Sequence, residues 1–224
     1  MRQPGSWDRL NAVYLDPPDS TEQILHPERY LNRDEPQLVA LDVDAVIGAL
    51  EPQGDTAWTH VYDDVLGELT ARLWLAHHLD DARLGQMLGN GLTINQAAEG
   101  WDGDRYYTLT AADRTLLITI SVWDRPQDAA EYAAAMSAML GVRFPEARRT
   151  QSRGDFGGHV CLQGATERHY VERWGEWVLT IQGIPAEQDL KPLREAIWSS
   201  RRAGAYPKTT TQGPGLGASP PAPL

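Results

Sequence analysis

The sequence predicts an α+β fold, in which a mostly helical N-terminal part precedes an antiparallel sheet of about five strands with helices packed on one face. Three observations favour this class. Residues 63–79 place apolar side chains at helical spacing. Residues 106–110 and 116–123 are rich in aromatic and β-branched side chains and flank a short polar turn, as in a β-hairpin. The order that follows, helix, three short strands and helix, is typical of a sheet covered by helices.

The N-terminal part contains short helices separated by turns. Ser20 is placed to cap the first of them, with Gln23 three residues later to complete a capping box. The next long helix has Leu66, Leu69 and Leu73 on one side, and this side is expected to face the core. The predicted elements are helices at 21–26, 63–79, 80–88 and 93–99 and an extended segment at 37–43.

The second half carries the predicted sheet. Its strands are expected at 106–110, 116–123, 159–163, 167–173 and 177–182, and its helices at 129–140 and 186–200. Gly175 and Glu176 form a tight turn between two of these strands. The segment 143–158 contains several arginines and is expected to be a locally basic, solvated loop.

Three regions follow from this pattern. Residues 1–100 form a helical lead-in, and residues 101–203 form the sheet layer, with the two expected to pack as one compact unit. Residues 204–224 are rich in Gly, Pro, Ala and Thr without periodicity, and this composition predicts a disordered tail.

Composition excludes several classes of protein. The 224 residues include 31 acidic and 20 basic side chains, a net charge of -11, which disfavours binding to nucleic acids. No apolar run approaches the ~20 residues of a membrane span, so no membrane insertion is expected. Residues 1–14 lack the apolar stretch of a signal peptide, so the cytoplasm is the default expectation, with export open if the natural chain begins upstream. Oligomeric state is left open.

Metal and nucleophile motifs are weak. The six histidines include no HExxH pair, and His77 and His78 are adjacent, so their side chains diverge by about 100° on a helix. His159 and His169 could meet across neighbouring strands, but no third ligand stands at a recognisable spacing. The single Cys161 lies in an apolar strand and is expected to be a small core residue. We therefore predict no catalytic residue, metal or cofactor.

The segment from Trp101 to Arg105 is the most distinctive local feature. Asp102 and Asp104, spaced by a glycine, could bind a cation or hold Arg105, with Trp101 as a stacking surface. The favoured alternative is a helix-to-strand connection, in which Trp101 belongs to the core and the charged residues lie on the surface. Together with Glu22 and His26, these residues are the candidate interaction site. A third, weaker hypothesis is a non-metal enzyme site around Asp102, Asp104 and His26.

Taken together, several motifs resemble one family. They are Ser-Thr-Glu-Gln-x-Leu-His-Pro-Glu-x-Tyr at 20–30, Gly-Glu at 67–68, Gly-Trp-x-Gly-Asp-Arg-Tyr at 100–106 and Trp-Asp at 123–124. Over residues 7–200 the chain resembles the C-terminal, non-catalytic region of uncharacterised bacterial and archaeal proteins that look like gluzincin-type zinc metallopeptidases. In that family the first motif follows a catalytic part with HExxH, which these 224 residues do not contain.

The resemblance implies an accessory region without its enzyme. We therefore expect a non-catalytic accessory or binding protein whose partner is a protein or peptide. The alternative is a fragment or subunit of a zinc metallopeptidase whose HExxH part lies upstream or on another chain. A zinc hydrolase needs an ion held by protein ligands and a general base for the attacking water, and neither is recognisable in this sequence.

Overall fold

A computed structural model of the chain describes residues 6–52, 55–154 and 157–205. The helices in this part are α1 (Ser6–Leu15), α2 (Thr21–Leu25), α3 (Pro27–Asn32), α4 (Val43–Gly48), α5 (Gly67–His78), α6 (Asp81–Leu88), α7 (Ile94–Ala98), α8 (Pro126–Arg143) and α9 (Leu190–Ser200). The strands are β1 (Gln37–Ala40), β2 (Thr59–Asp64), β3 (Trp101–Ala111), β4 (Arg114–Trp123), β5 (Arg148–Gly154), β6 (Gly157–Gln163), β7 (Glu167–Trp174), β8 (Trp177–Pro185) and β9 (Arg202–Ala205).

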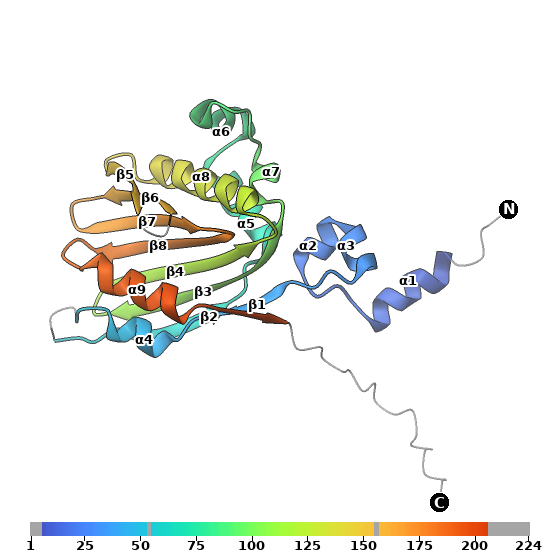
Figure 1. The fold of residues 1–224 in the computed structure, drawn as a ribbon, viewed down its shortest axis with the longest axis horizontal. Coiled ribbons are helices and arrows are strands. Elements are labelled where there is room, and N and C mark those ends of the chain that lie inside the picture. Colours follow the sequence, from blue (N-terminus) through green and yellow to red (C-terminus); the bar gives the residue numbers. More distant parts are fainter. Residues whose placement is uncertain (1–5, 53–54, 155–156, 206–224) are drawn as a thin grey trace, which may run out of the picture.

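The strands form one large and one small antiparallel sheet (Figure 1). The large sheet has seven strands in the order β2-β3-β4-β8-β7-β6-β5, and β1 pairs with β9 beside it. The β3–β4 hairpin pairs Tyr106 with Thr119, and its turn contains Ala112 at a positive φ of 52°. The β7–β8 hairpin turns at Gly175 and Glu176, as the sequence predicts.

Helices cover both faces of the large sheet. On β4, Leu116, Ile118 and Ile120 point to one side, where α4 and α9 pack over a core that includes Leu193, Ile197 and Trp198. On the other side, α5, α7 and α8 pack against Trp101, Trp123, Val171 and Val178. Since neighbouring residues of a strand point to opposite faces, this alternation places one hydrophobic core on each side of the sheet.

The α+β class is confirmed, and two details differ from the expectation. The sheet has seven strands instead of about five, and helices pack on both faces instead of one. The additional strands are the two edges. β2 is almost entirely exposed, and β5 is the arginine-containing segment that the sequence suggested was a loop. Edge strands carry polar and charged side chains, so they lack the apolar alternation that identifies inner strands.

The N-terminal part also departs from a purely helical lead-in. It contains β1 and β2, and β2 belongs to the large sheet. The segment 100–105 is not a loop, because β3 begins at Trp101. The predicted tail begins too early, because Gly204 and Ala205 belong to β9 and pair with β1. The rest of it, from 206 onward, lies outside the described residues. No helix in the described part of the chain is long and apolar enough to cross a membrane.

Candidate functional site

The motif at 20–30 is held in place by hydrogen bonds of the Ser20 and Gln23 side chains. The hydroxyl of Ser20 accepts a hydrogen bond of 3.2 Å from the Gln23 N–H and so caps α2, as predicted. The Gln23 side chain reaches back to the N–H of Asp19, at 2.8 Å, instead of that of Ser20. Its amide nitrogen also donates to the Asp34 carbonyl at 2.6 Å. These bonds fix the position of α2 relative to the end of α3.

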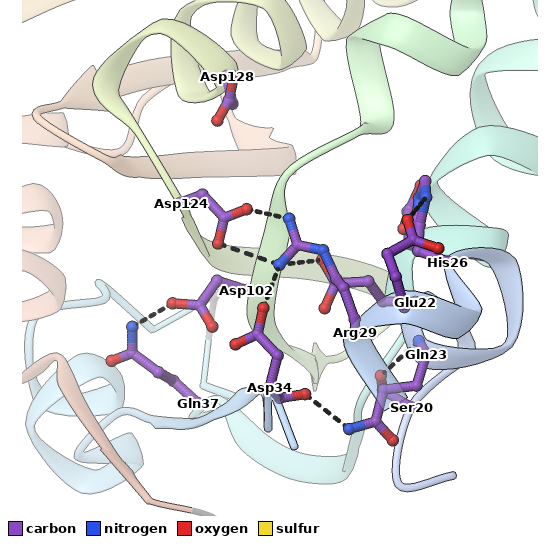
Figure 2. Close-up of polar contacts among 12 residues, drawn as sticks. Ser20, Glu22, Gln23, His26, Arg29, Asp34, Gln37, Asp102, Asp124 and Asp128 are labelled. Atoms are coloured by element: carbon purple, nitrogen blue, oxygen red, sulfur yellow. Dashed lines mark hydrogen bonds and ion pairs between the residues drawn. The ribbon is translucent and has the colours of Figure 1, made fainter. Parts of the chain in front are cut away.

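Two buried glutamates, Glu22 of α2 and Glu68 of α5, lie where this segment meets α5. Figure 2 labels Glu22 and His26. Glu68 is fully buried, and its Oε1 lies 3.0 Å from His26 Nε2 and also pairs with Arg72. Glu22 is 2% exposed, with its Oε1 3.2 Å from an Arg29 nitrogen. Burial raises the pKa of Glu22 to about 8, against the attraction of Arg29, and Asp124, Glu68 and Asp34 add to the rise.

Arg29 joins α3 to the end of β4. Its guanidinium pairs with Asp34 at 3.0 Å and with Asp124, the residue after β4, as the dashed lines of Figure 2 show. The hydrogen bond to Asp124 raises the pKa of Arg29, and the nearby carboxylates of Glu22, Asp124 and Asp34 raise it further, whereas burial lowers it. The net effect is a rise, so Arg29 is always charged. Asp102 lies near this network and accepts a hydrogen bond from Gln37, while burial raises its pKa.

The remaining candidate residues, Trp101, Asp104 and Arg105, lie outside this network and make contacts within the fold. Asp104 is 3% exposed and accepts hydrogen bonds from the backbone N–H groups of Leu66, at 2.7 Å, and Gly67, at 3.1 Å. It also accepts one from the indole of Trp101 at 2.9 Å. Burial raises its pKa to about 6, against these hydrogen bonds. Arg105 pairs with Asp63 of β2 at 2.6 Å.

The six candidate residues therefore form two groups. Glu22, His26 and Asp102 lie around the Arg29 network, whereas Trp101, Asp104 and Arg105 hold β3 to α5 and β2. Asp102 and Asp104 share no bonding partner among the described residues, which gives no support to one enzyme site made of Asp102, Asp104 and His26. The core position of Trp101, 2% exposed, agrees with the favoured interpretation, but its surface pair of Asp104 and Arg105 was wrong. Asp104 is buried against the start of α5, and Arg105 pairs with Asp63 instead.

Sequence reasoning missed the residues that complete the network. Glu68 and Asp124 were quoted only as parts of motifs and not as site residues, and Arg29, Asp34 and Arg72 were not named as candidates. The only pattern in the sequence that bears on α5 is its row of leucines, which predicted the wrong core side of the helix. The buried residues of α5 include Glu68, Ala71 and Leu75, while Leu69 and Leu73 are 40% and 61% exposed.

The network can hold segments together, although Glu22 Oε1, Glu68 Oε2 and Arg72 Nε have no hydrogen-bond partner among the described residues. Within the described residues, no cluster of three or more His, Cys, Asp or Glu side chains has the arrangement to hold a metal ion. His159 pairs in the sheet with Glu172 and His169 with Leu162, so the two histidines are not opposite each other. Burial raises the pKa of the Cys161 thiol, which disfavours the nucleophilic thiolate.

A Glu22→Gln variant tests the raised pKa of Glu22. The folded state holds this proton up to a pH of about 8, whereas the unfolded chain releases it near 4.5, so rising pH between these values removes stability. Glutamine resembles the neutral acid and cannot ionise. We expect the advantage of the variant in urea stability to be small at pH 5.5 and to grow by roughly 1–3 kcal/mol by pH 9. Glu28→Gln, at a 69% exposed position, is the control; a constant difference across pH would contradict the shift.

Comparison with known proteins gives one match. The family model described as a domain of unknown function (DUF8575) matches residues 57–194, which is more than half of the chain and includes α5, α8 and all seven strands of the large sheet. No curated protein and no solved structure matches the chain. The matched segment crosses the predicted boundary at residue 100 and lies C-terminal to the Arg29 segment. The chain therefore belongs to the DUF8575 family of domains of unknown function.

Proposed function

We propose that the protein is a non-catalytic accessory protein that binds a protein partner through α1–α3. One observation carries the proposal: five large apolar side chains of this segment are 64–83% exposed. They are Trp7, Tyr14, Leu15, Ile24 and Leu31. Figure 1 shows these helices beside the sheet, with α1 furthest from it. Exposed apolar side chains gathered in one segment are typical of a surface that a partner covers.

The bonding of the ionisable groups supports a binding role. Arg29 pairs with Glu22 and with Asp124, and Glu68 of α5 contacts His26, so these contacts hold α2 and α3 to α5 and β4. A firmly held segment presents Ile24 and Leu31 in a fixed geometry. This arrangement lowers the entropy cost of binding, because the segment does not have to become ordered in the complex.

The second candidate is the subunit or fragment of a zinc metallopeptidase implied by the sequence resemblance. The same apolar surface favours it, because a catalytic part on another chain or upstream would pack where the motif at 20–30 lies. The two candidates differ in what the complex does. A complex of the second kind contains stoichiometric zinc and cleaves peptides, whereas a complex of the first kind does neither.

An Ile24→Glu/Leu31→Glu double variant tests the α1–α3 surface. A partner is first recovered with the wild-type chain, then purified and titrated by calorimetry. We expect saturable 1:1 binding that the double variant weakens at least tenfold, since two charges are placed in an apolar contact. Met87→Glu, on α6 at a 45% exposed position, is the control and should bind as the wild type.

Two results would overturn or redirect the proposal. Equal binding by the double variant, with unchanged circular dichroism, would show that α1–α3 is not the contact surface. Zinc bound stoichiometrically by the complex together with peptide cleavage would replace the accessory role by the metallopeptidase candidate. Sequencing of the DNA upstream of Met1 then decides whether an HExxH part belongs to the same chain.

A further inference from the structure

Helix α5 turns an apolar side away from the core. Its buried side carries Glu68, Ala71 and Leu75, and the sequence-predicted core residues Leu69 and Leu73 are instead 40% and 61% exposed. An apolar side chain at such a position gains nothing from folding of this chain alone. The outer side of α5 therefore exposes two leucines that the core of this chain does not cover.

Two adjoining cavities lie along this helix, and we call them together the α5 groove. The first has a volume of about 220 Å³ between α5 and strands β3 and β4, and is lined by Leu66, Thr70, Trp74, Tyr106, Leu117 and Thr119. The second has a volume of about 520 Å³, and is lined by Thr70, Leu73, Trp74, His77, His78 and Arg143. Both include Thr70 and Trp74, so the two hollows adjoin at these side chains, and the second is a shallow depression open to solvent.

The groove has an apolar end and a basic end. The first cavity is lined by aromatic, aliphatic and threonine side chains, and the second includes Arg143 from the last turn of α8. Neither lining contains an Asp or Glu, although the whole chain has a net charge of -11. Burial, with His77 and Arg143 nearby, lowers the pKa of His78, so Arg143 is the permanent cation here.

Polar groups without partners lie under the groove. Thr119, a lining residue 4% exposed, has a hydroxyl with no hydrogen-bond partner in the described part of the chain. Gln182, 6% exposed, pairs in the sheet with the lining residue Leu117, and its amide nitrogen is also without a partner there. Its amide oxygen accepts a hydrogen bond of 2.9 Å from Arg143. Buried polar groups left without partners cost stability, and a ligand often supplies the missing one.

We propose that the α5 groove binds a small carboxylic acid with an apolar chain. The chain occupies the cavity between α5 and the β3–β4 hairpin, and the carboxylate pairs with Arg143, which keeps its hydrogen bond to Gln182. The apolar chain gives the Thr119 hydroxyl no partner, so the charge of Arg143 is what selects the acid. Charge complementarity selects an acid over an amine, and a guanidinium is the side chain best suited to a carboxylate. The volumes suit a small molecule and are too small for a folded segment. This proposal is independent of partner binding by α1–α3.

The test uses octanoate as the acid and 1-octanol as its uncharged match. We expect octanoate to shift the indole N–H signal of Trp74 in two-dimensional NMR and to saturate it, with octanol at least tenfold weaker. Arg143→Gln should weaken octanoate at least tenfold and leave octanol unchanged. Thr70→Tyr, at an exposed helix position that lines both cavities, should block both compounds. Arg83→Gln, an exposed arginine of α6, is the matched charge control.

Other results would overturn the proposal. If octanoate and octanol bind equally well and Arg143→Gln changes neither affinity, the groove binds apolar chains but does not recognise the carboxylate. A peptide ending in a leucine carboxylate that binds tenfold tighter than octanoate would assign the groove to a polypeptide. Absence of any Trp74 shift in a folded wild-type protein would exclude the site. Failure here leaves the Ile24→Glu/Leu31→Glu experiment unaffected, so the two proposals fail separately.

Discussion

Replacing Glu172 with alanine is expected to lower the free energy of unfolding by about 3–5 kcal/mol, because it removes one partner of a buried ion pair. Glu172 lies in β7 and is fully buried. One of its oxygens accepts hydrogen bonds from Arg194 Nε at 2.9 Å and from the Trp198 indole at 2.7 Å, and the other pairs with Arg194. The carboxylate thus joins α9 to the sheet. Alanine would leave the indole N–H and part of a guanidinium without a partner inside the core.

The measurement is urea unfolding followed by circular dichroism. Glu172→Gln keeps the shape and one acceptor, so we expect it to lose less stability than alanine. Glu172→Ala/Arg194→Met removes both charges and should recover part of the loss, since an apolar side chain is easily buried beside Trp198. A loss below about 1 kcal/mol for Glu172→Ala would show that water replaces the carboxylate and that the contact contributes little.

The inner part of the sheet follows from local sequence. Strands β3, β4, β7 and β8 contain several β-branched and aromatic residues, and their hairpins turn at Ala112-Asp113 and Gly175-Glu176. Each hairpin is therefore recognisable from its own stretch of sequence. Thr93 caps α7 with Gln96 in a complete capping box, a pattern within four residues. These features depend on neighbours in the chain, and a single sequence therefore shows them.

The orientation of α5 depends on residues far away in the chain. Glu68 can be buried because His26, at the junction of α2 and α3, and Arg72 both contact its carboxylate. No local pattern shows this partnership, and the leucines on the opposite side therefore suggested the wrong core face. The same holds for the candidate site. Glu22 and His26 were found through a motif, but Arg29 and Asp124 join them only because α3 lies at the end of β4.

Asp104→Ala is the second large effect, and it distinguishes a structural from a functional role for the most distinctive motif of the sequence. Helix α5 begins without a side-chain cap of its own. Asp104 supplies that cap from β3, by accepting the N–H groups of Leu66 and Gly67, and it also holds the indole of Trp101. Alanine leaves three donors unpaired in a buried region, so we expect a loss of about 3 kcal/mol.

Hydrogen exchange provides the specific readout. The amide protons of Leu66 and Gly67 should exchange faster in Asp104→Ala, whereas those in the β7–β8 hairpin should change only in proportion to global stability. Asp104→Asn keeps one acceptor but turns an NH₂ group toward other donors, so it should fall between wild type and alanine. Unchanged stability and exchange combined with lost partner or octanoate binding would contradict the structural role.

The start of α5 matters beyond stability, because the same helix carries Thr70 and Trp74 of the α5 groove. A cap supplied by β3 therefore sets the position of both groove walls at once.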